Sequence, residues 1–163
     1  MKRDESSTAF LDTTFLLPLF QLNIDVKAFS PEGFRKFLAG LTEIHFSELS
    51  IFEAKAKLFT LSRKNHAYNP AMLNFGDNLA VLRKDERVVF HPYTERDDTH
   101  LNLISAKALK LDCFDAIIVT QALDSALLIT EDRDILDLRE EKAFREDPIL
   151  GKLTIRQWKE LGY

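Results

Sequence analysis

The sequence predicts an α/β protein with a mostly parallel sheet of four or five strands. Short apolar runs that suit buried strands alternate along the chain with longer helical patterns. One of these runs, residues 126–130, is apolar on both faces, as strands of a parallel sheet are. Only five Gly and five Pro occur among the 163 residues, which favours long regular elements, mostly helices, over a turn-rich sandwich.

The expected strands are apolar runs that stop at polar or turn-forming residues. The first stops at Asp12, and the third is closed by a His-Pro pair. The four strands are expected at residues 8–11, 44–46, 87–90 and 126–130.

Capping residues mark where several helices begin. Ser30 is an N-cap followed by Pro31, which suits the first helical position. Thr94 begins another helix, and Thr154 is expected to cap a charged helix over residues 155–161. The remaining helices are expected at 15–17, 47–65, 70–84, 94–109 and 115–123. The helix over 47–65 is expected to bury an apolar face formed by Leu49, Phe52, Ala56 and Phe59, and the helix over 115–123 is apolar enough to be central.

Composition excludes several classes of protein. The formal net charge of −4 gives no overall attraction to nucleic acid, so a polyanionic substrate would need a local basic face or a bound cation. Cys113 is the single cysteine, which excludes an intramolecular disulfide. No apolar run approaches the roughly 20 residues of a membrane helix, and the N-terminus carries no secretory stretch. We expect a cytoplasmic protein with one domain over residues 1–163 and no membrane partner.

Acidic residues follow the predicted strands at the edge where ligands bind in open α/β sheets. Asp12 closes the first strand, and Asp132 and Asp134 follow the fourth. Glu53 lies on the helix after the second strand, and Asp115 begins the buried helix before the fourth. Carboxylates that converge in a dry cleft repel one another unless a cation is bound. Their oxygen atoms suit Mg²⁺ or Mn²⁺, which indicates phosphodiester hydrolysis.

Each acid also has a purely structural interpretation. Asp112 or Asp115 could cap its helix, and Asp132 and Asp134 could do the same. Glu53 stands four residues before Lys57, the favourable order for a surface ion pair. Four basic residues share the helix of Glu53 and form either an RNA-binding face or an ordinary solvated one: Lys55, Lys57, Arg63 and Lys64.

Four segments, in this order, resemble the signatures of PIN-domain nucleases. They are Phe10-Leu11-Asp12-Thr13-Thr14-Phe15-Leu16, Ser47 with Glu53 six residues later, Phe114-Asp115-Ala116-Ile117-Ile118, and Leu128-Ile129-Thr130-Glu131-Asp132-Arg133-Asp134. The resemblance extends from about residue 8 to about residue 154. It is greatest to the toxin ribonucleases of VapBC systems and their archaeal relatives.

The resemblance implies a three-layer α/β/α sandwich and a Mg²⁺-dependent endoribonuclease, with Mn²⁺ as an alternative ion. The family's acidic quartet is matched by Asp12, Glu53, Asp115 and Asp132, an additional acid by Asp134, and the hydroxyl beside the last acid by Thr130. By this resemblance Asp12, Asp115 and Asp132 bind the metal directly, and Glu53 acts through water or on a second metal. Thr130 then orients a carboxylate or the scissile phosphate. An RNA substrate and an antitoxin partner are implied as well.

Two other functions stay open at the level of sequence. The same fold without catalysis would be an RNA-binding or scaffold module, although the complete quartet argues against it. A haloacid-dehalogenase-like phosphatase would use Asp12 as its nucleophile, but that family needs an acid where this chain has Thr14. A homodimer is also expected, because several apolar side chains exceed what one small core absorbs: Phe34, Phe37, Leu38, Leu41, Leu58, Phe59 and Leu61.

Overall fold

The protein, described here by a computed structural model over residues 7–163, is built on a five-stranded sheet in the order β3-β2-β1-β4-β5. Each neighbouring pair of strands is parallel, which confirms the predicted parallel sheet. The strands are β1 (Thr8–Leu11), β2 (Glu43–Ser47), β3 (Val88–His91), β4 (Leu127–Ile129) and β5 (Thr154–Arg156).

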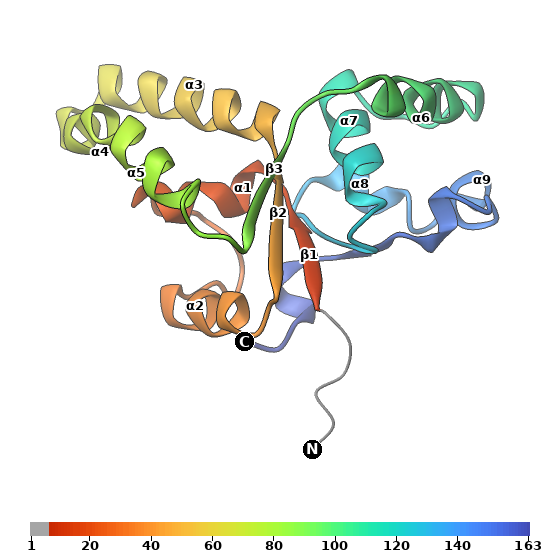
Figure 1. Ribbon diagram of the computed structural model, residues 1–163, viewed down its shortest axis with the longest axis horizontal. Helices are drawn as coiled ribbons and strands as arrows, with labels where there is room; N and C mark the ends of the chain where they lie inside the picture. The colour runs from red at the N-terminus through yellow and green to blue at the C-terminus, as the bar shows by residue number, and fades with distance from the viewer. Residues whose placement is uncertain (1–6) are drawn as a thin grey trace.

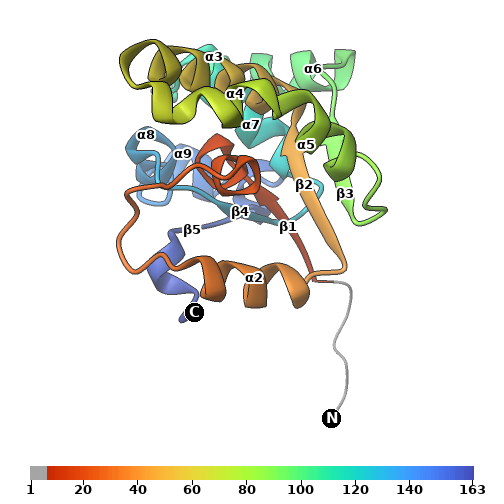
Figure 2. The ribbon, with the colours of Figure 1, turned by 90° about the vertical axis from the view of Figure 1, so that its left-hand side faces the viewer.

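Helices cover both faces of the sheet, so the predicted three-layer α/β/α sandwich is confirmed (Figure 1). One face is covered by α1 (Thr13–Leu16), α2 (Pro31–Ala39), α3 (Glu48–Lys64), α4 (Asn69–Leu73) and α5 (Phe75–Leu82). The other is covered by α6 (Glu95–Ala106), α7 (Cys113–Ala122), α8 (Arg133–Asp137) and α9 (Lys142–Arg145). Figure 2 shows α3, α4 and α5 together above the sheet, with α2 at its opposite end.

The central strand divides the apolar core into two clusters. Ala9 and Leu11 of β1 belong to the cluster on the side of α1 to α5, whereas Phe10 belongs to the cluster on the side of α6 to α9. This alternation follows from the two-residue repeat of a strand, whose successive side chains point to opposite faces. Because both faces are covered, β1 and β4 are apolar on both sides.

The strand order creates a switch point between β1 and β4. From β1 the chain continues to β2 and β3 on one side, and then crosses to β4 and β5 on the other. Two crossover connections that leave in opposite directions open a crevice at the carboxyl ends of the strands between them. Asp12 follows β1 and Thr130 follows β4, so both lie at this crevice.

Several predicted helix starts are confirmed by hydrogen bonds. The Ser30 hydroxyl accepts from the Gly33 N–H at 3.0 Å, and the Ser47 hydroxyl accepts from the Leu49 N–H at 3.2 Å. Thr94 and Asp97 form a reciprocal capping box at the start of α6. Helix α7 is buried along its length from residue 116 to residue 122, as its apolar sequence predicts.

The predicted core face of α3 is wrong. Phe52 and Phe59 are 71% and 51% exposed, Ala56 is exposed as well, and Leu49 is only partly buried. The buried residues are Ser50, Ile51, Ala54 and Leu58. The small Ser50 lies against Thr13 of α1, on which α3 packs, so the side of α3 that carries Ser50 and Ala54 is buried and Phe52 and Phe59 lie on the solvent side.

Two other segments differ from the prediction. Residues 154–156 form β5, the fifth strand, rather than the start of a helix, because Ile155 packs into the core beside β4. Only a short 3₁₀ turn follows, at Trp158–Glu160. The helix predicted over 70–84 is divided into α4 and α5, with the break at Asn74.

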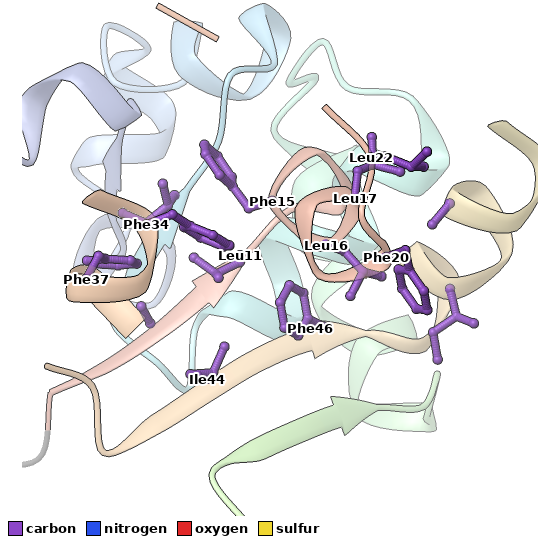
Figure 3. Packing of buried hydrophobic residues seen from close by; sticks show 14 of the residues in the cluster. Leu11, Phe15, Leu16, Leu17, Phe20, Leu22, Phe34, Phe37, Ile44 and Phe46 are labelled. Atoms are coloured by element: carbon purple, nitrogen blue, oxygen red, sulfur yellow. The ribbon is translucent and has the colours of Figure 1, made fainter. Parts of the chain in front are cut away.

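Trp158 covers much of the apolar surface from which we predicted self-association. Phe34 and Phe37 of α2 pack on it with ring centroids 5.8 and 5.7 Å apart, and its indole N–H donates to the Ala28 carbonyl at 3.1 Å. Figure 3 shows the two phenylalanines pointing from α2 toward Leu11 in the same cluster. Leu41 and Leu58 are also buried. The structure therefore leaves few residues of that set, among them Phe59, exposed for a second copy.

We expect Leu58→Ala to lower the free energy of unfolding by about 2–5 kcal/mol, since it empties a fully buried position. Its neighbour provides a matched control: Phe59→Ala removes a larger side chain from an exposed position, and should cost less than about 1 kcal/mol. Urea unfolding of the two variants measures both values. A larger loss from Phe59→Ala would contradict the orientation of α3.

Candidate functional site

The switch point holds an open pocket of about 250 Å³ at the carboxyl ends of β1 and β4. Residues from four segments of the chain meet there, so the acids that line the pocket are far apart in sequence. The lining residues are Asp12, Thr13, Thr14, Glu53, Asp115, Ile118, Glu131, Asp132 and Ile135. The predicted quartet, Asp12, Glu53, Asp115 and Asp132, is thus brought to one pocket.

Asp12 is buried at the end of β1 and accepts hydrogen bonds at both carboxylate oxygens. Its Oδ1 accepts from the Thr14 N–H at 2.8 Å. Its Oδ2 accepts from the Thr130 hydroxyl and from the Glu131 N–H, the latter at 3.3 Å. Burial outweighs these bonds and raises the pKa of the Asp12 carboxyl to about 6. Ionised Asp12 therefore destabilises the folded protein unless a cation is bound beside it.

Thr130 connects the first acid to the last. The hydroxyl is fully buried and donates to Asp12 while accepting from the Asp132 N–H at 3.0 Å. The end of β1 and the loop after β4 are thereby held in one arrangement. The predicted role of Thr130 in orienting a carboxylate agrees with these contacts and remains a proposal.

Asp115 is free to face the pocket because a different residue caps its helix. The Asp112 carboxylate accepts from the Asp115 N–H at 2.9 Å and is the N-cap of α7. Partial burial, followed by the charge of Asp132, raises the pKa of the Asp115 carboxyl to about 7. The structural interpretation of Asp115 as a cap is thus excluded, and Asp112 takes that role.

Asp132 combines a structural role with a place in the pocket. Its Oδ1 accepts from the Asp134 and Ile135 N–H groups at 2.8 and 3.3 Å and so caps α8. Carboxylate oxygens of Asp115, Asp132 and Asp134 all lie within 4.8 Å of one another. Of the three acids predicted to bind the metal directly, this group contains Asp115 and Asp132. Its third member is Asp134, which does not line the pocket, rather than Asp12, which does.

Glu53 is held by a hydroxyl rather than by the lysine one turn later. The Thr13 hydroxyl bonds to the Glu53 carboxylate and lies 2.9 Å from the Ser50 hydroxyl. Within residues 7–163, no ion pair joins Glu53 to Lys57. The surface ion pair weighed at the sequence level is absent, and Glu53 turns toward the pocket instead.

The donor set fits a hard divalent cation. Carboxylates supply oxygen ligands, and the group of Asp115, Asp132 and Asp134 stays open to water and substrate on its exposed side. Burial and mutual repulsion already raise the pKa of Asp12 and Asp115, which is the expected consequence of acids gathered without a counter-charge. A divalent ion in the pocket would supply that charge.

Sequence reasoning missed two residues that support the acids. Glu131 donates its N–H to Asp12 and accepts from the Trp158 N–H at 2.8 Å, so it joins the pocket to the C-terminal segment. Ser50 is fully buried beside Thr13. Glu131 could have been found from its place inside the Thr130–Asp134 loop. Ser50 could have been found because it lies three residues before Glu53 on the same helix, and residues at this spacing share one face.

Comparison with known proteins shows the fold. No protein-family model and no curated protein sequence matches the chain. Among solved structures, a chain of VapBC2 from Rickettsia felis, crystallised bound to a DNA fragment from their promoter, superposes with a TM-score of 0.59 at 14% identity. That match covers 93% of this chain and 98% of the other. PAE2754 from Pyrobaculum aerophilum superposes with a TM-score of 0.58 at 17% identity, covering 94% and 85% of the two chains.

The chain therefore has the same fold as these two structures, one of them from a VapBC complex, which agrees with the resemblance of its sequence. Identities this low establish the architecture alone, so the activity must be argued from the pocket. Over residues 7–163, no helix combines the length and the apolar character that crossing a lipid bilayer requires.

We expect Asp115→Asn to stabilise the metal-free protein at pH 8. The folded-state pKa of about 7 lies above the ordinary value near 3.9, so ionisation of Asp115 destabilises the fold increasingly as pH rises from about 4 to 7. The gain should be a few degrees in Tm at pH 8, at roughly 2–4 °C per kcal/mol, and should vanish near pH 4. Thermal unfolding in EDTA measures it, with Asp137→Asn outside the pocket as control. An equal gain at both pH values would contradict this origin.

Proposed function

We propose that the protein is a divalent-metal-dependent endoribonuclease that acts in the cytoplasm. The observation that carries the proposal is the group formed by Asp115, Asp132 and Asp134 at the switch point, beside the buried Asp12. The PIN-like fold supports it, since the predicted resemblance and the architecture agree. Mg²⁺ is the proposed ion, with Mn²⁺ as the alternative.

The proposed reaction is hydrolysis of a phosphodiester bond. Water adds its hydroxyl to phosphorus, the bond from phosphorus to the leaving oxygen breaks, and that oxygen takes the proton. A bound divalent ion would neutralise phosphate charge and make water more acidic. Asp115, Asp132 and Asp134 would hold the ion, and Asp12, fixed by Thr130, would complete the site.

Glu53 has a separate proposed role. Its carboxylate lies in the same pocket but outside the group of three, on a helix from the other side of the sheet. Thr13 fixes its direction. We assign Glu53 the role of orienting the attacking water molecule and accepting its proton, as a carboxylate can. The proposal also allows a second ion that is bound through Glu53.

Cleavage of a labelled single-stranded RNA pool tests the proposal. Wild type should cleave with Mg²⁺ or Mn²⁺ and stop in EDTA. Asp12→Asn, Asp115→Asn and Asp132→Asn should each lose about 100-fold or more, since even residues that only support metal ligands are worth roughly 10–100-fold.

Asp137→Asn is the matched control, because it removes an exposed carboxylate of α8 that does not line the pocket. RNA binding without cleavage under any metal would contradict the nuclease and favour the non-catalytic module. Equal activity in EDTA would contradict metal dependence.

We further propose that the protein is the toxin component of a toxin–antitoxin pair and forms a homodimer. The fold match to a chain of VapBC2, crystallised with promoter DNA, supports an antitoxin partner. The helices α3, α4 and α5 carry four large exposed apolar side chains that suit a second copy: Phe52, Phe59, Leu73 and Val81.

Phe52→Ser combined with Phe59→Ser should therefore change a dimer into a monomer, as light scattering at high concentration would measure. These side chains are exposed within one chain, so at a dilution where wild type is also monomeric the variant should unfold as wild type does. A wild-type monomer at high concentration would contradict the dimer, as would a variant that stays dimeric.

A further inference from the structure

The helix that carries Glu53 also carries four cations, and the structure separates them into two pairs. An α-helix turns by about 100° per residue. Lys57 and Lys64 follow Glu53 by four and eleven residues, so they point within about 40° of its direction. Both are exposed. They therefore continue, along the outer length of α3, the side on which Glu53 faces the acidic pocket.

The other two cations of α3 have partners on a different side. The Lys55 ammonium donates to the Met72 carbonyl at 3.3 Å and lies 4.7 Å from the ring centre of Phe75. Arg63 lies 5.8 Å from the ring centre of the exposed Phe59. These contacts tie Lys55 to α4 and α5, and Arg63 to the outer apolar face of α3.

Lys57 and Lys64 have no such partner. In the part of the chain that the structure describes, neither ammonium forms an ion pair or a hydrogen bond with another side chain. Glu53, the natural partner of Lys57 by spacing, is bonded to Thr13 instead. Two lysines that face one way without a carboxylate are available to an external anion.

The charge distribution points to a polyanion. Residues 48–84, which span α3 to α5, contain six Lys and Arg against three Asp and Glu, whereas the whole chain carries −4. An RNA strand that enters the pocket meets a cluster of carboxylates, which repel its phosphates. Cations directly beyond that cluster would offset the repulsion and hold the strand in place.

We infer that Lys57 and Lys64 form a phosphate-binding ridge that guides the backbone of the RNA substrate away from the acidic pocket along α3. The inference rests on the proposed nuclease function. At 1.5 Å per residue, Lys57 lies about 6 Å and Lys64 about 16 Å beyond Glu53 along the helix axis. The ridge thus contacts phosphates outside the cleaved bond and contributes to affinity rather than to the chemical step.

Binding of a labelled single-stranded RNA to the full chain, measured by fluorescence anisotropy from 0.05 to about 0.4 M salt, tests the ridge. Asp12→Asn in Mg²⁺ serves as the background that prevents cleavage. Adding Lys57→Gln and Lys64→Gln should weaken binding by about fivefold each at 0.1 M salt. It should also reduce the slope of log K against log salt by about 0.7 for each lysine lost.

The control removes one charge from another side of α3 and one from the chain just after α5. Arg63→Gln with Lys84→Gln should change affinity less than twofold, and Lys57→Arg with Lys64→Arg should restore binding. In the cleaving protein, the Lys57→Gln/Lys64→Gln pair should raise KM with kcat unchanged.

An equal loss of affinity in the charge-matched control would overturn the ridge, and so would an unchanged salt slope. A shift in oligomeric state caused by the lysine variants would also overturn it, because it would assign this side of α3 to a protein interface. Failure of the nuclease proposal is separate, because it shows as absent cleavage by wild type, whereas failure of the ridge leaves cleavage and KM unaltered.

Discussion

The buried carboxylate of Asp12 is the contact on which both the sheet and the pocket depend. It ends the central strand, and its bonds to Thr130 and Glu131 join β1 to the loop after β4, across the switch point. Through Glu131 the same network reaches Trp158 and the C-terminal segment. Burying an ionised carboxylate costs several kcal/mol unless hydrogen bonds or a counter-charge offset it. Here the raised pKa of about 6 shows that the bonds alone do not.

The acids gathered in the pocket therefore lower the stability of the fold when no cation is bound. Asp115 reaches a pKa of about 7 because it is partly buried beside Asp132, an arrangement that a purely structural site would avoid. The cap formed by Ser47 shows the contrast, because its neutral hydroxyl satisfies a backbone N–H group at the start of α3 without adding a charge. A divalent cation would turn the same repulsion into binding energy, which links the stability of the fold to occupancy of the pocket.

The fold and the acids could be predicted because strand ends carry local signals. Buried runs that are followed by Asp12 and by Asp132 identify two strands and the edge where they meet. The buried face of α3 could not be predicted, since its larger apolar residues point outward and the small Ser50 and Ala54 lie on its buried side. Residues 154–156 form a strand only because β4 is available as a neighbour, which is a long-range condition. Glu131 and Ser50 act through contacts between distant segments, so local pattern does not reveal them.

The central claim is that Asp115, Asp132 and Asp134 form a divalent-metal site at the switch point. An anomalous difference map from crystals grown with Mn²⁺ tests it most directly, because manganese is located independently of any activity. We predict a peak within coordinating distance of carboxylate oxygens of that group, and its loss in Asp115→Asn crystals. A peak elsewhere, or an empty pocket at saturating Mn²⁺, would contradict it.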